Sequence, residues 1–264
     1  MIIFFHNNSK VTEIVSSDDN HFTIPKNSSI ISVIIEFANK YSNDILVWCH
    51  QNEKENLNIS FIKSFFQHNK FLISYNPSSI TYFGRESGYI EDTQFVNLNR
   101  KVKYATWMMS SSVGAIHSET ILAIQKDINP KDNFDYFLNS IAKITMPKGL
   151  FCYSLPNLLN NNDTQIQNNK SSLFELYKFT KQHYKIRWVF LLFLNLMIFE
   201  KRITFLPLLT SLFYKRRKIN TEKLDKIEYV SKHNKLTSKT IDILIPTIGR
   251  KSYLQDVLKN LASQ

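Results

Sequence analysis

Apolar positions in the first 160 residues alternate between helical spacing and short β-rich runs. In "NSSIISVIIEFANKY" the apolar residues Ile30, Ile31, Ile34 and Phe37 recur at helical spacing, whereas "DILVWCH" is a short run typical of a buried strand. The same alternation continues, in order, through "NISFIKSFFQH", "KFLISYNP", "HSETILAIQKD", "DNFDYFLNSIAKI" and "KGLFCYSLP". Strands that alternate with helices predict an α/β domain with a mostly parallel sheet over residues 1–160.

A different pattern follows. A polar linker over residues 161–172 leads into an aromatic, basic and helical segment over 173–218 and a polar connector over 219–240. Trp188 to Phe199 is apolar except for Asn195, but its twelve residues fall short of the ~20 that span a bilayer. Two interpretations stay open: a buried helix that caps the first domain, which the length favours, or a helix that lies in a membrane interface.

The end of the chain reads as strand, loop and helix. Ile243–Ile245 predicts a strand that ends at Pro246, and Leu254, Val257, Leu258 and Leu261 follow the spacing of an amphipathic helix. The loop between them would lie at the carboxyl end of the strand, where open α/β sheets bind ligands. The alternative is an ordinary strand–helix unit without a ligand.

This stretch resembles the start of bacterial family 2 glycosyltransferases, which have the Rossmann-like GT-A fold. The matching elements are the apolar strand, Pro246, Thr247, Arg250, the Tyr253–Leu254 pair and the final Ser263–Gln264. The resemblance implies that Pro246, Thr247 and Arg250 bind the nucleotide of a nucleotide-sugar donor, and that a divalent metal, Mg²⁺ or Mn²⁺, serves the full-length enzyme. The implied acceptor is a glycan or a lipid-linked glycan in surface polysaccharide synthesis.

Only fourteen residues follow Arg250. The metal-binding Asp-x-Asp and the catalytic carboxylate of the family would come later, so residues 241–264 are expected to be the first strand and helix of a truncated, incomplete second α/β domain. We expect the chain alone to lack transferase activity and to hold no cofactor.

The first domain resembles a degenerate GT-A domain more loosely. The stretches "YATWMMSSSVGAIHSETILAI" and "NFDYFLNSIAKITMPKGLFCYSLP" carry this resemblance, which implies that Asp135 is a catalytic base. A simple helix-start role for Asp135 is the favoured alternative. Where paired carboxylates would hold a metal, the chain has His50, Gln51 and Asn52; the adjacent Glu91 and Asp92 are poor substitutes, so no metal site is predicted.

The positive charge of the chain is concentrated in one segment. The formal net charge is +11, and residues 171–220 contain ten basic and two acidic residues. An anionic partner is expected for this segment, although a solvated basic face is an equally good interpretation. Nucleic acid is disfavoured because "YKRRK" accompanies no recognition motif.

Two isolated cysteines, Cys49 and Cys152, and the lack of a signal-peptide pattern favour a cytoplasmic protein, peripheral to the inner face of the cell membrane if its basic segment binds there. Beside sugar transfer, the alternative function is therefore a non-catalytic binding or scaffold module on an anionic membrane surface.

Overall fold

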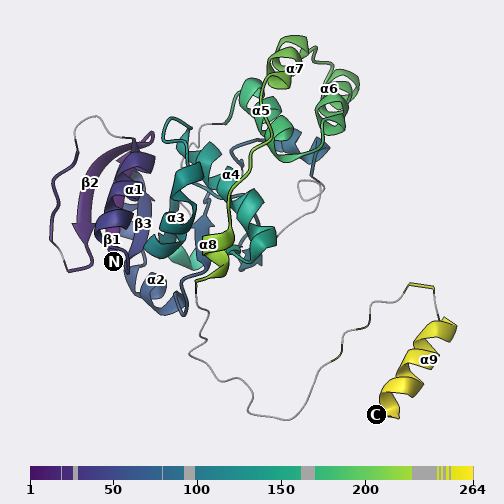
Figure 1. Ribbon diagram of the computed structural model, residues 1–264, viewed down its shortest axis with the longest axis horizontal. Coiled ribbons are helices and arrows are strands. Elements are labelled where there is room, and N and C mark those ends of the chain that lie inside the picture. Colours follow the sequence, from purple (N-terminus) through teal and green to yellow (C-terminus); the bar gives the residue numbers. More distant parts are fainter. Residues whose placement is uncertain are drawn as a thin grey trace. The chain divides into compact units, whose positions relative to one another are not determined.

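The chain folds as two compact units, Met1–Val230 and Ser231–Gln264, and each is described by itself. The computed structural model describes residues 1–18, 20–25, 29–78, 80–91, 99–161, 170–227, 243, 245, 248–249 and 251–263. Figure 1 labels the helices and strands along the chain.

The first unit is an α/β domain built on one seven-stranded sheet with the order β2-β1-β3-β6-β4-β7-β5. Its strands are β1 (Ile2–Asn7), β2 (Lys10–Ser16), β3 (Ile45–His50), β4 (Phe71–Tyr75), β5 (Tyr104–Ala105), β6 (Val113–His117) and β7 (Phe151–Ser154). The pairs β1–β3 and β4–β7 are parallel, and the other four pairs are antiparallel. The sheet is therefore mixed, and the expectation of a mostly parallel sheet was wrong.

The central strand β6 explains that difference. It lies antiparallel between β3 and β4, and its residues Gly114 and Ala115 are poor strand formers, so the sequence pattern did not mark it as a strand. A Cβ atom at Gly114 would lie 2.3 Å from Cζ2 of Trp48 and 2.5 Å from the carbonyl oxygen of Ile73. The small residue is required because the Trp48 ring occupies that space.

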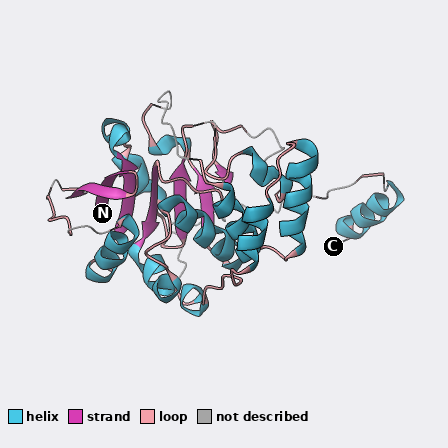
Figure 2. Cartoon of the chain, turned by 90° about the horizontal axis from the view of Figure 1, so that it is seen from above, coloured by secondary structure: helices cyan, strands magenta, loops and turns pink. Residues whose placement is uncertain are grey.

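Helices cover both faces of the sheet (Figure 2). The helices of this unit are α1 (Ile30–Lys40), α2 (Ile59–Phe65), α3 (Ser118–Ile124), α4 (Phe134–Thr145), α5 (Leu173–His183), α6 (Arg187–Phe199), α7 (Phe205–Leu212) and α8 (Glu222–Asp225), and α9 (Lys251–Ala262) belongs to the second unit. Short 3-10 turns are η1 (Gln51–Asn56), η2 (Arg85–Tyr89), η4 (Gln125–Asp127), η5 (Met146–Lys148) and η6 (Pro156–Leu158). The helices predicted around α1, α2, α3 and α4 are confirmed, and His117 is the N-cap of α3.

Alternate strand residues build two cores. One face of the sheet, with Phe4, Trp48 and Leu72, packs against α1, α3 and α4. The other face, with Phe5, Val47 and Ile73, packs against α2 and η6. Cys49 and Cys152 are buried free thiols.

The helical segment packs on the first of these two layers. Helix α5 lies against α4, where the Tyr136 hydroxyl donates to Oε1 of Gln182 at 2.6 Å and Ser140 Oγ lies 3.0 Å from Nε2 of His183. Helix α7 contacts α5 and α6, and α8 contacts α3 through the buried Leu224. Helices α5 to α8 thus belong to the same unit as the sheet.

Candidate functional site

Asp135 lies in the first turn of α4, whose N-cap is Asn133. Its Oδ1 accepts a hydrogen bond from the Ser111 backbone N–H and its Oδ2 accepts one from Ser111 Oγ, both at 2.8 Å. Desolvation by the surrounding protein raises the pKa of Asp135 to about 6, although the two bonds from Ser111 oppose the shift. The carboxyl group could therefore exchange a proton near neutral pH.

His6, near the end of β1, forms a hydrogen bond with the backbone of Ser111. Its Nε2 donates to the Ser111 carbonyl oxygen at 2.8 Å, because a carbonyl can only accept. Burial lowers the pKa of His6 to about 4, so the ring is neutral at physiological pH and its buried Nδ1 has no hydrogen-bond partner within the described residues. Its ring lies edge-on to His50, the neighbouring residue on β3, at 5.7 Å between centroids.

Two backbone carbonyl groups that precede Ser111 also accept hydrogen bonds from buried side chains. Nε1 of Trp48 donates to the Ser110 carbonyl oxygen at 3.0 Å, and Nδ2 of Asn139 donates to the Met109 carbonyl oxygen at 2.9 Å. Both oxygens of Asp135 are engaged in this arrangement, so their first role is to join α4 to the start of β6. The catalytic role of Asp135 stays a prediction.

The residues considered for a metal are dispersed. His50 caps η1 by accepting from the Asn52 N–H at 3.2 Å, and Gln51 Oε1 accepts from Oγ1 of Thr12 at 2.8 Å. Glu91 is paired with Lys143 at 2.7 Å, while Asp92 lies outside the described residues. The described parts of the chain bring together no group of three or more His, Cys, Asp or Glu side chains able to hold a metal ion.

The predicted nucleotide-binding residues Pro246, Thr247 and Arg250 lie outside the described residues. Next to them, Gly249 has a positive φ of 65°, and α9 spans Lys251–Ala262 as the apolar spacing predicts. No described residue of α9 is buried, and the apolar Val257 and Leu258 are 41% and 51% exposed.

Helices α6 and α7 are joined by residues 200–204 and form the α6–α7 hairpin. Each helix buries three residues on its inner face: Val189, Leu192 and Leu196 on α6, and Pro207, Leu208 and Ser211 on α7. No described helix is both long and apolar enough to cross a bilayer. The inner faces account for few of the apolar residues in the hairpin.

The remaining apolar residues lie at the surface and define the outer surface of the hairpin. Ile203, in the connection, is 81% exposed, and Phe213, just after α7, is 88% exposed. The other exposed apolar side chains are Phe190, Leu191, Leu194, Met197, Ile198, Phe199, Phe205, Leu206, Leu209 and Leu212. The expectation of a buried helix was therefore wrong for most of α6, whose apolar residues cover two faces of which only one packs on the domain.

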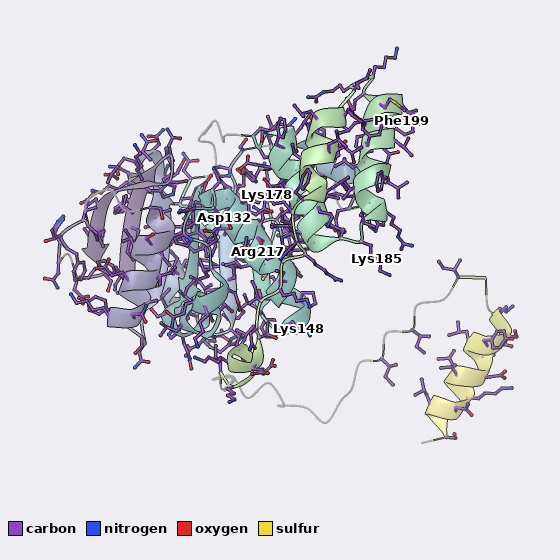
Figure 3. All side chains as sticks on the ribbon, turned by 45° about the horizontal axis from the view of Figure 1, so that its top comes forward. Asp132, Lys148, Lys178, Lys185, Phe199 and Arg217 are labelled. Carbon is purple, nitrogen blue, oxygen red and sulfur yellow. The ribbon has the colours of Figure 1, made fainter. Side chains whose placement is uncertain are left out.

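Basic residues accompany this outer surface. Apart from Arg202, which pairs with Glu86, the exposed ones are Lys185, Arg187, Lys201, Lys215, Arg216 and Lys218, here called the basic rim. Arg217 differs, because its guanidinium binds Asp132 at 2.7 Å and is only 10% exposed. Lys178 lies 3.3 Å from the other oxygen of the same carboxylate, and Figure 3 shows the three side chains together. The basic segment thus contains both a structural ion-pair cluster and a solvent-facing rim.

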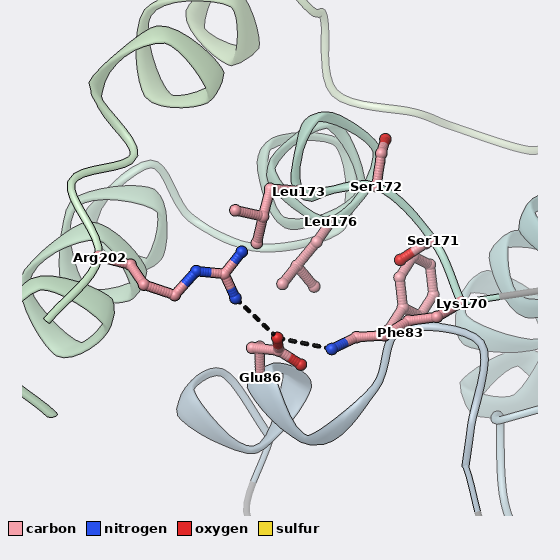
Figure 4. Close-up of a pocket in the computed structure, with 8 residues that line it drawn as sticks. All are labelled: Phe83, Glu86, Lys170, Ser171, Ser172, Leu173, Leu176 and Arg202. Atoms are coloured by element: carbon pink, nitrogen blue, oxygen red, sulfur yellow. Dashed lines mark hydrogen bonds and ion pairs between the residues drawn. The ribbon is translucent and has the colours of Figure 1, made fainter. Parts of the chain in front are cut away.

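One pocket of about 220 Å³ lies between η2, the start of α5 and the connection of the hairpin. At its floor Oε1 of Glu86 accepts from Lys170 Nζ at 2.6 Å and from Arg202 Nη1 at 3.2 Å, and Figure 4 shows the two cations approaching from opposite sides. Phe83, Leu173 and Leu176 supply the apolar lining. Sequence reasoning missed Glu86, because "GRESGY" carries no apolar period or motif around it.

Comparisons of the chain with protein families, with curated proteins and with solved structures found no match.

Proposed function

We propose that this protein attaches peripherally to anionic membrane surfaces through the outer surface of the α6–α7 hairpin. The observation that carries the proposal is the exposure of large apolar side chains on two consecutive helices, together with a basic rim on the same segment. A helix that is apolar all round is normally buried, so a wide exposed apolar face marks an interaction site.

The two kinds of residue supply different parts of the binding energy. Phe205, Leu206 and Phe213 are 57%, 62% and 88% exposed, and fully burying such side chains is worth roughly 1.5–3 kcal/mol each. Each Lys or Arg near anionic headgroups adds about 1 kcal/mol, screened by salt. The apolar part separates this surface from a merely solvated basic face, which has no side chains to insert.

An anionic membrane fits the outer surface better than a second copy of the chain does. A symmetric dimer would place the basic rims of two hairpins close together, where like charges repel. Anionic headgroups above an acyl layer instead complement both the cations and the apolar side chains. The proposed place of action is the cytoplasmic face of the cell membrane.

Vesicle co-sedimentation tests this proposal. The wild-type chain should bind anionic vesicles and not neutral ones, and salt should weaken the binding. Replacing Lys215, Arg216 and Lys218 with Gln should weaken binding by roughly a hundredfold at low salt, since three charges are lost. Arg217 is kept because Asp132 requires it. Lys10, Lys63 and Lys126 are also exposed but lie outside the hairpin, so their triple Gln variant, with the same charge change, should bind almost normally.

An apolar variant completes the test. Phe205→Ser with Phe213→Ser should abolish binding while leaving the fold intact, since both side chains are exposed. Equal sedimentation of the wild type and both hairpin variants would refute the membrane proposal. A dimer in solution that the apolar variant dissociates would assign the outer surface to a second copy instead.

We also propose, as a second candidate, a role in the transfer of a sugar from a nucleotide sugar. The support is the resemblance at residues 241–264, the helix α9 at its expected place, and a raised pKa at Asp135. A GT-A-like, Rossmann-like first domain belongs to the same proposal. Nucleotide-sugar turnover by this chain with Mg²⁺ or Mn²⁺ should be absent. Turnover that Asp135→Asn removes would make the first domain itself an enzyme.

A further inference from the structure

The pocket at Glu86 is too small for a nucleotide sugar. Pockets for drug-sized ligands and cofactors usually enclose about 300–1,000 Å³, whereas this one holds about 220 Å³. Its size suits a phosphate group with a few attached carbon atoms.

The cations at the pocket are only partly used. The Lys170 and Arg202 side chains are 47% and 48% exposed, and each makes a single side-chain contact in the described part of the chain, to the same oxygen of Glu86. An ammonium has three donors and a guanidinium has five, so both retain donors for an anion. Two cations against one carboxylate leave a surplus positive charge.

The opening of α5 adds to this attraction. The pocket is lined by Ser171 and Ser172, and Ser172 is the N-cap of this eleven-residue helix. A helix N-terminus favours phosphate through its dipole and its first N–H groups, although at α5 the N–H groups of Ser172 and Glu175 are already bonded within a capping box. Oγ of Ser171 is buried and has no partner among the described residues, so it can donate to the same anion.

Glu86 requires a different group of the ligand. Its side chain is 9% exposed, and its second oxygen, Oε2, is buried without a partner in the described chain. Burial raises the pKa of this carboxyl, but Lys170, its own backbone N–H and Arg202 outweigh burial and hold the pKa below its usual value, so the group stays ionised and can only accept a hydrogen bond. A ligand with a hydrogen-bond donor beside its phosphate, such as a hydroxyl, would satisfy Oε2.

We propose that this pocket binds a glycerophosphate group: the phosphate between Lys170, Arg202 and Ser171, and a glycerol hydroxyl on Oε2 of Glu86. This inference rests on the proposed membrane attachment, because it takes the group to be the headgroup of a phosphatidylglycerol lipid. Arg202 belongs to the connection of the hairpin and adjoins residue 203, which is 81% exposed. A lipid beside the outer surface could thus place its headgroup in the pocket.

Two lipids of equal charge test the inference. Phosphatidylglycerol and phosphatidylethanol carry the same phosphodiester, but only phosphatidylglycerol has headgroup hydroxyls. At equal mole fractions in phosphatidylcholine vesicles, the wild type should bind phosphatidylglycerol about tenfold more tightly, the value of one hydrogen bond to a charged group. Glu86→Gln should reduce this preference, because a neutral amide replaces the charged acceptor, without weakening binding to phosphatidylethanol. Ser171→Ala should weaken binding to both lipids and preserve the preference.

The outcomes separate the two proposals. Equal binding of the two lipids by the wild type would overturn the pocket inference and leave the hairpin proposal standing. No binding to either lipid would refute the hairpin proposal. A calorimetric titration with soluble glycerol 3-phosphate then decides the source of the group: binding that Ser171→Ala weakens would assign the pocket to a free glycerophosphate, and no binding together with a preference for phosphatidylglycerol would assign it to the lipid headgroup.

Discussion

Helices α4 and α6 are of similar length but meet the solvent in opposite ways. Helix α4 contains Asp, Asn, Ser, Lys and Thr, yet nine of its twelve residues are buried. Helix α6 is apolar at almost every position, yet only three of its thirteen residues are buried. Apolar content therefore identifies a helix without telling how deeply it is buried.

The polar groups of α4 explain how it tolerates burial. Asn139 donates to the Met109 and Asp135 carbonyl oxygens, and Oγ1 of Thr145 donates to the Ile141 carbonyl oxygen at 2.7 Å. A buried polar group with partners costs little, whereas exposed apolar surface in water carries a steady cost. The buried polar groups of α4 named here thus have partners within the domain. The outer face of α6 instead leaves its apolar side chains exposed to water.

Leucine truncations should give the largest difference between the two helices. Leu138 of α4 is 1% exposed, and Leu138→Ala should lower the free energy of unfolding by about 2–5 kcal/mol. Leu194 of α6 is 43% exposed, and Leu194→Ala should change it by less than about 1 kcal/mol. Urea unfolding measures both, with Leu192→Ala, on the buried face of α6, as the internal control. A large loss for Leu194→Ala would show that the outer face is covered within the domain.

Lowering the pH should destabilise the fold through its buried histidines. Burial lowers the pKa of His6 to about 4 and that of His183, which packs against α4, to about 3. Between about pH 6.5 and pH 4 these histidines bind protons only in the unfolded chain, so the free energy of unfolding falls as the pH falls. His6 alone should account for about 3 kcal/mol.

The matched variant for this effect is His6→Gln, which keeps a donor for the Ser111 carbonyl oxygen but does not titrate. Its unfolding free energy should depend less steeply on pH than that of the wild type. Asp135 acts in the opposite direction: its raised pKa favours the folded state as the pH falls from about 6 to 4. An unchanged pH profile in His6→Gln would contradict the burial argument.

The smallest difference in the free energy of unfolding is expected between variants of Arg216 and Arg217, which are adjacent in the sequence. Arg217 and Asp132 are 10% and 4% exposed, so Arg217→Gln removes one of two cations from a buried carboxylate and should cost about 1–3 kcal/mol. Arg216 is exposed, and Arg216→Gln should cost less than about 0.5 kcal/mol while weakening vesicle binding. Thermal unfolding and co-sedimentation of the two variants should therefore rank them in opposite orders.

The sequence predicted the elements whose local pattern and packing agree. Helices α1 and α4 and strand β3 follow their apolar spacing. Strand β6 was missed because Gly114 is dictated by the Trp48 ring of a strand more than sixty residues earlier, which no local window contains. Strand β2 was missed because it is an edge strand with a largely polar pattern.

The candidate sites were predictable only in part. Asp135 was identified, but its partner Ser111 and the opposing His6 become neighbours only through the sheet. The basic segment was identified, but the division between Arg217, bound to Asp132, and the exposed rim depends on a carboxylate eighty-five residues away. The exposure of the outer surface could not be predicted from the sequence either, because a helix that is apolar at almost every position, as α6 is, is typical of a core helix.

The position of β6 also bears on the order in which the sheet can form during synthesis. Strands β2, β1 and β3 form one half of the sheet and β4, β7 and β5 the other, and in the described sheet only β6 hydrogen-bonds to both. The emerging chain delivers β3 and β4 well before residue 117, so neither can acquire its native neighbour on that side until β6 leaves the ribosome. The facing edges of β3 and β4 therefore stay unpaired until β6 emerges, which exposes the centre of the finished sheet to mispairing in the nascent chain.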